Sequence, residues 1–108
     1  MKITVTEQVS RTVIVALQER LDAFSAPQMR EQLDALLAGG ATQFIIDLSQ
    51  MPFLDSAGMA VLVSLLKRAR QAGGDVQLVK PTSGAVLRIL QLTRFDRVFD
   101  MLDALPAK

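Results

Sequence analysis

The chain has 108 residues, with 12 Lys and Arg against 11 Asp and Glu, a formal net charge of +1 and a hydrophobic content of 50%. This length suffices for one domain with a buried core, and the composition excludes wholesale disorder. The near-zero net charge gives no general attraction to nucleic acid or to a membrane surface. The absence of Cys and His excludes disulfides, thiol chemistry, the common zinc sites and His-based catalytic triads. No apolar run approaches the roughly 18 residues of a membrane span and no signal-peptide pattern opens the chain, so we expect a cytoplasmic protein.

Alternating apolar residues near the N-terminus predict an antiparallel β-hairpin. Ile3 and Val5 alternate with polar residues, and the alternation returns over residues 13–17 after a polar turn around Ser10 and Arg11. A polar and apolar connection over residues 19–24 then leads into the first helix.

Three helices are expected, because apolar residues recur at helical spacing between recognisable start and stop signals. The first begins at an N-cap, Ser25, with the capping-box pattern S-x-x-Q, and ends at the glycine pair 39–40. The second covers residues 56–72 and stops at a second glycine pair, 73–74. The third follows the polar segment 81–83.

The remaining apolar segments predict strands. Residues 44–48 are apolar through most of their length, as in a central strand covered on both faces. Residues 76–78 predict a further short strand, and the tail 95–105 is expected to hold an edge strand around residues 98–99 and a final helical turn or two. The alternation of strands and helices predicts a single α/β (α+β-like) domain over residues 1–108, in which helices pack against a mixed β-sheet that begins with an antiparallel hairpin.

The most informative stretch is Asp55-Ser56-Ala57-Gly58, where a loop passes into the second helix. A serine at this junction lies beside the unpaired N–H groups and the positive dipole end of a helix. Ser56 is therefore a natural N-cap, and its hydroxyl is also in a place that favours a phosphate. Both interpretations are consistent with the local sequence.

The second helix is unusual, because its first half is apolar nearly all round. Such a helix is either buried on all sides or exposes apolar surface to a partner. The end next to Ser56, with Met59 and Val63, is a candidate docking face. Each of these side chains could equally belong to the core.

No catalytic site is indicated. Residues 56–58 resemble half of a nucleophile elbow, but Leu54 stands where G-x-S-x-G needs its first glycine, and no His is present to activate the serine. Asp22, Asp47 and Asp55 could form a carboxylate cluster for Mg²⁺, although such aspartates more often cap turns and helices. We therefore expect a protein that is not an enzyme, with no catalytic residue, no metal and no cofactor.

Several motifs together carry a resemblance to a known family. Four features follow one another along the chain: R-L-D at residues 20–22, D-S-A-G at 55–58, the apolar helix closed by a glycine pair, and the segment 88–99. From residue 3 to about residue 101 this order resembles the STAS family, and within it the stand-alone anti-sigma factor antagonists of bacteria. The resemblance implies a single STAS-type domain.

The resemblance also implies a switch rather than a reaction catalysed by this chain. The serine of D-S-x-G, here Ser56, would be phosphorylated by an anti-sigma factor that is also an ATP-dependent serine kinase. The unphosphorylated chain would bind that kinase and release a sigma factor, and the phosphorylated chain would not hold it. A metal-dependent protein serine phosphatase would reset the switch. Neither nucleic acid nor a membrane is an expected direct partner.

The resemblance places two aspartates around the phosphoacceptor. Asp22 would lie near Ser56 and help to shape the kinase-binding surface, and Asp55 would sit beside the serine. The expected partner-binding residues are Asp22, Asp55, Ser56, Ala57, Gly58, Met59 and Val63.

One departure from the family pattern is Glu19, because family members commonly carry glycine just before the R/E-L-D segment. The departure adds a negative charge near the expected binding face. A second hypothesis is a structural STAS subunit of a transporter ATPase complex or a stress-signalling scaffold, in which Ser56 is never phosphorylated. An independent serine hydrolase is a third and more distant alternative.

Overall fold

The computed structural model describes residues 3–9 and 12–106 as one sheet with helices packed on it. The elements follow in the order β1 (Ile3–Val9), β2 (Thr12–Leu17), α1 (Ala26–Ala38), β3 (Gln43–Asp47), α2 (Ser56–Gln71), β4 (Asp75–Val79), α3 (Gly84–Leu92), α4 (Phe95–Val98) and β5 (Asp100–Leu102). The turn expected around Ser10 and Arg11 lies outside the described residues.

The sheet has five strands in the order β1-β2-β3-β4-β5. β1 pairs antiparallel with β2, and every later pair is parallel. The expected hairpin and mixed sheet are therefore confirmed. The parallel pairs need crossovers, which α1 and α2 supply between β2, β3 and β4.

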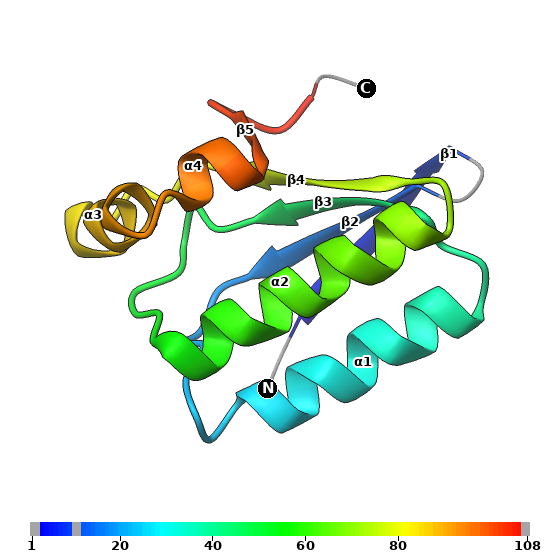
Figure 1. Ribbon diagram of the computed structural model, residues 1–108, viewed down its shortest axis with the longest axis horizontal. Helices are drawn as coiled ribbons and strands as arrows, with labels where there is room; N and C mark the ends of the chain where they lie inside the picture. The colour runs from blue at the N-terminus through cyan, green and yellow to red at the C-terminus, as the bar shows by residue number, and fades with distance from the viewer. Residues whose placement is uncertain (1–2, 10–11, 107–108) are drawn as a thin grey trace.

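The two long helices cover one face of the sheet. Figure 1 shows α1 and α2 side by side across that face, with α3 and α4 at one end of the molecule. Val15, Ile46 and Leu78 stand in register on neighbouring strands and are fully buried. The core between sheet and helices also takes Met29 of α1 and Leu62 of α2. No helix in the described part of the chain has the length and hydropathy needed to cross a membrane.

The predicted capping box at the start of α1 is wrong. Ser25 precedes the helix in a helical backbone conformation, φ −89° and ψ −19°, and its side chain makes no cap hydrogen bond. Its hydroxyl instead donates to the Arg20 carbonyl at 2.8 Å and accepts from the Asp22 N–H at 3.0 Å. The loop before α1 therefore engages the hydroxyl that the sequence pattern assigned to the helix.

The predicted tail is wrong in its order. The short helix α4 covers Val98, and the edge strand β5 follows it at Asp100–Leu102 instead of lying around residues 98–99. Phe95 and Phe99 explain the difference, since their ring centroids lie 5.4 Å apart across one helical turn and Phe99 is buried. In the described residues after β5, up to residue 106, no helical turn forms.

Candidate functional site

Two loops that are distant in sequence meet at one edge of the sheet. The loop after β2 and the loop after β3 leave neighbouring parallel strands, so they emerge at the same carboxyl edge. Leu21 and Leu54 form an isolated parallel bridge there, and both side chains are buried. The Leu21 N–H donates to the Phe53 carbonyl at 3.0 Å, and the Asp55 N–H donates to the Leu21 carbonyl at 3.2 Å. The bridge places the R-L-D segment beside D-S-A-G.

Asp55 is the N-cap of α2. It has an extended backbone, and its Oδ1 atom accepts hydrogen bonds from the Ala57 and Gly58 N–H groups, each at 3.0 Å. Its Oδ2 atom accepts from the Ala23 N–H at 3.2 Å. The carboxylate thus satisfies two of the orphan donors of the helix and also holds the facing loop.

The N-cap predicted at Ser56 is therefore wrong by one residue. Ser56 is the first residue of α2 and is exposed. A carboxylate has two acceptor oxygens, so Asp55 can accept three N–H groups, which a single hydroxyl could not. The Ser56 hydroxyl has no part in capping the helix.

Asp22 organises the loop that contacts Asp55 through Ala23. Its Oδ1 atom accepts hydrogen bonds from the N–H groups of Phe24 at 3.0 Å and Ser25 at 3.1 Å, and Oδ2 lies 3.4 Å from Nε of Arg20. The hydrogen bond from the Ser25 N–H lowers the pKa of the Asp22 carboxyl most strongly. The Phe24 N–H, the Ser25 hydroxyl and Arg20 also lower this pKa, and partial burial opposes them. Asp22 therefore carries its negative charge into acid solution.

Arg20 and Phe53 form the outer rim of the bridge. The Arg20 guanidinium lies over the Phe53 ring, 4.6 Å from its centroid, and the Phe53 side chain is 39% exposed. Both residues flank the buried leucine pair on the solvent side. The rim thus adds a cation and an aromatic ring to a surface that also holds two carboxylates.

Gly58 belongs to the packing beneath the site. A Cβ atom there would lie 2.6 Å from the Leu21 carbonyl oxygen and 2.8 Å from Cδ1 of Leu54. The D-S-A-G glycine therefore lets α2 start directly against the bridged loops, and it presents no surface to a partner.

The other expected contact residues divide between surface and core. Val63 is 42% exposed, whereas Ala57 and Met59 are half-buried and pack against the core. The apolar circumference of α2 is therefore mostly explained by burial against the sheet and α1, and an exposed strip remains next to Ser56.

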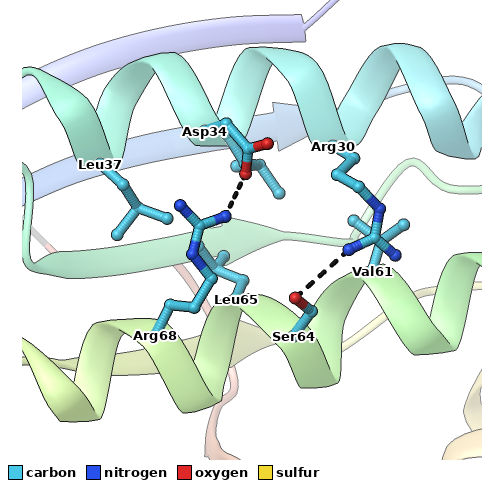
Figure 2. Close-up of a pocket in the computed structure, with 8 residues that line it drawn as sticks. Arg30, Asp34, Leu37, Val61, Ser64, Leu65 and Arg68 are labelled. Atoms are coloured by element: carbon cyan, nitrogen blue, oxygen red, sulfur yellow. Dashed lines mark hydrogen bonds and ion pairs between the residues drawn. The ribbon is translucent and has the colours of Figure 1, made fainter.

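The groove between α1 and α2 is closed by two polar contacts. Arg30 of α1 donates to the Ser64 hydroxyl at 3.3 Å, and Arg68 of α2 pairs with Asp34. Figure 2 shows both contacts spanning the two helices. The same residues line a small cavity of about 10 Å³. A cavity of this size holds one water molecule at most and leaves no room for a ligand.

The sequence interpretation missed Phe24 and Arg30. Phe24 is 96% exposed, directly after Asp22 and Ala23. Arg30 borders a shallow depression whose other lining residues are Ala23, Ala26, Pro27, Ala57 and Ala60. Phe24 could have been noticed in the sequence, because it is an aromatic residue within the connection before the first helix. Arg30 could not, because its position at the depression depends on how the two helices pack.

The three aspartates that could have formed a metal cluster each cap a turn or helix. Asp47 accepts the Ser49 N–H at 3.0 Å, and Asp22 and Asp55 accept backbone donors as described. Over residues 3–9 and 12–106, no three potential ligand side chains gather in a way that could hold a metal ion.

Comparisons with known proteins agree with this architecture. The sequence model of the STAS domain matches residues 3–106. The anti-sigma-B factor antagonist of Bacillus subtilis is 29% identical over 95 residues, which cover 88% of this chain and 85% of that protein.

Solved structures show the same fold. The crystal structure of an anti-sigma factor antagonist from Mycobacterium paratuberculosis superposes with a TM-score of 0.80 at 26% identity, covering 96% of this chain and 88% of that one. The Bacillus protein SpoIIAA superposes in its unphosphorylated form with a TM-score of 0.75 and in its phosphorylated form with 0.76, both at 22% identity. The unphosphorylated structure covers 96% of this chain and 90% of that one, and the phosphorylated structure covers 96% and 92%.

Proposed function

The chain belongs to the STAS domain family, and on that premise we propose that it is an anti-sigma factor antagonist controlled by phosphorylation of Ser56. The unphosphorylated chain binds an anti-sigma factor that is also a serine kinase, and a sigma factor is released. Phosphorylation ends this binding, and a metal-dependent phosphatase restores it. In this scheme the chain is a substrate and a binding partner and catalyses no step.

One observation carries the proposal: Asp55 caps α2, so the exposed hydroxyl of Ser56 is not needed to hold the helix. A kinase can therefore modify Ser56 without removing a cap. The added phosphoryl group carries about −1.5 to −2 charges and lies at the positive end of a 16-residue helix. The fold can accept this charge.

Loss of binding then follows from electrostatics at the surface. Asp55 precedes Ser56 directly, so a phosphate on Ser56 would add to the negative charge already present at the start of α2. An acidic group of the partner that faced this phosphate would be a like charge across the interface, which costs several kcal/mol. A loss of about 3 kcal/mol weakens a complex roughly a hundredfold, which is enough to operate a switch.

The proposal is tested with the purified chain, candidate serine kinases and ATP. Intact mass should increase by one phosphoryl group in the wild type and stay unchanged in Ser56→Ala. Ser56→Ala should bind the kinase as the unmodified chain does, while Ser56→Asp should lose binding. Equal binding of both variants would exclude the switch.

The experiment also separates the second hypothesis, a structural STAS subunit. A stable stoichiometric complex with a transporter ATPase, formed equally well by wild type and Ser56→Asp, would favour that role and overturn the proposal.

A further inference from the structure

The N-terminal ends of α1 and α2 meet around a shallow depression of about 480 Å³. Its lining residues are Ala23, Ala26, Pro27, Arg30, Ala57 and Ala60. Five of these six side chains are small and apolar, so they form an apolar floor on which a protruding side chain can pack. This volume accommodates one or two side chains of a partner and is open to solvent.

The depression adjoins Ser56. Ala57 follows Ser56 directly in the chain. Ala60 lies one helical turn after Ser56, so Ser56 and Ala60 share a face of α2. A group seated in the depression would therefore lie within reach of a phosphate on Ser56.

Phe24 stands beside the depression, next to its lining residue Ala23. Its side chain is 96% exposed, while its N–H is fixed by a 3.0 Å hydrogen bond to Asp22. An exposed aromatic ring on a fixed backbone has little folding role. It is typical of residues that dominate the energy of a protein interface.

Arg30 gives the depression its only lining charge. It donates to a neutral hydroxyl, that of Ser64, and forms no ion pair with a described residue. Arg68 provides the contrast, because it bridges the same two helices through an ion pair with Asp34. The Arg30 guanidinium therefore retains its capacity to pair with a carboxylate.

We propose that the depression receives a segment of the kinase that carries an apolar side chain beside an acidic residue. The apolar side chain fills the alanine-lined floor against Phe24, and the carboxylate pairs with Arg30. This inference rests on the proposed function and specifies its partner chemistry: an acidic group held next to Ser56 is a group that a phosphate would repel.

The test measures binding of the kinase that phosphorylates Ser56 to the full chain carrying Phe24→Ser, Arg30→Met or Arg68→Met. Phe24→Ser should weaken binding at least about tenfold, since truncation of a central aromatic contact typically costs that much. Arg30→Met should weaken binding about fivefold and reduce its dependence on salt. Arg68→Met is the matched control, because it removes a contact between the same helices, and its binding should stay within about twofold of wild type. Thermal unfolding of each variant shows that the fold is retained.

The outcomes separate this inference from the proposed function. If Phe24→Ser and Arg30→Met bind as wild type while Ser56→Asp does not bind, the inference is wrong and the proposed function stands. If Arg30→Met and Arg68→Met weaken binding equally, helix packing explains the effect and the role of Arg30 is excluded. If Ser56→Asp also binds as wild type, or if no serine kinase modifies Ser56, the proposed function fails and this inference fails with it.

Discussion

The Oδ2 atom of Asp55 accepts a 3.2 Å hydrogen bond from the backbone N–H of Ala23, a residue 32 positions earlier in the chain. The other oxygen of the same carboxylate caps α2. One side chain thus fixes both the start of α2 and the loop that faces it. The position of the start of α2 relative to the loop at Ala23 depends on this carboxylate.

Replacing Asp55 should therefore destabilise the fold and loosen the site. Asp55→Ala removes the cap and the link to Ala23, and we expect a loss of about 1–2 kcal/mol in the free energy of unfolding, as for other N-cap truncations. Ser56→Ala is the control and should stay within about 0.5 kcal/mol of wild type, because its hydroxyl caps nothing. Urea denaturation measures both. Equal losses in the two variants would mean that Ser56 shares the capping role.

The close approach of α2 to the Leu21 loop gives a prediction for glycine. In Gly58→Ala the new methyl group would meet the Leu21 carbonyl oxygen at 2.6 Å, so the helix or loop must shift. We expect a loss of about 1–3 kcal/mol, as for other overpacked sites. Gly84→Ala, in the first turn of α3, has no atom within 4 Å of its new Cβ and should be neutral or stabilising by up to about 1 kcal/mol. Denaturant unfolding of the pair tests this contrast.

The lowered pKa of Asp22 predicts how stability depends on pH. A carboxyl whose pKa is lower in the folded state stabilises the fold at a pH above its unfolded pKa, about 3.9. That contribution is lost as the pH falls through the folded pKa. Asp22→Asn should therefore show a shallower loss of unfolding free energy below about pH 4 than wild type. Urea unfolding at a series of pH values measures the slope.

Salt distinguishes the cause of this dependence. The largest effect on Asp22 is a hydrogen bond from the Ser25 N–H, which salt screens weakly, whereas Lys80 lowers the pKa of the exposed Asp103 through a surface ion pair. At about 1 M salt, the contribution of Asp22 to the pH dependence of the unfolding free energy should persist, and the contribution of Asp103 should become smaller. If both fade together, the charge of Arg20 and not the loop hydrogen bonds controls Asp22.

The sequence was sufficient for the sheet and for the order of the elements as far as α3, because periodicity reports burial directly. Alternation in β2 and helical spacing in α1 and α2 reflect a face toward the core, and the structure confirms these elements. The tail could not be predicted in the same way. Its short helix and strand depend on the contact of Phe95 with Phe99 and on the pairing of β5 with β4, and neither leaves a periodic pattern.

The capping residues were also beyond local sequence. Ser25 and Ser56 both match preferred N-cap types, yet neither caps its helix. At α2 the Asp55 carboxylate takes the capping role, because it can accept several N–H groups at once. At α1 the Ser25 hydroxyl is held by the backbone of Arg20 and Asp22, and no side chain caps the helix. The bridge of Leu21 with Leu54 brings the two loops together, and it lies beyond the ends of the paired parallel strands β2 and β3, far from any local sequence signal.

Phosphorylation of Ser56 should leave the fold of the chain intact. The phosphate on Ser56 gains from the positive end of α2, by about 0.3–1 kcal/mol, and is opposed by the adjacent Asp55 carboxylate. These opposing effects should leave the unfolding free energy within about 1 kcal/mol of the unmodified chain, while kinase binding falls about a hundredfold. Calorimetry of both forms, prepared from one batch, measures the first quantity, and titration calorimetry with the kinase measures the second. A phosphorylated chain that unfolds more than about 2 kcal/mol more easily would place the switch in the fold itself, since that loss exceeds the dipole and repulsion effects together.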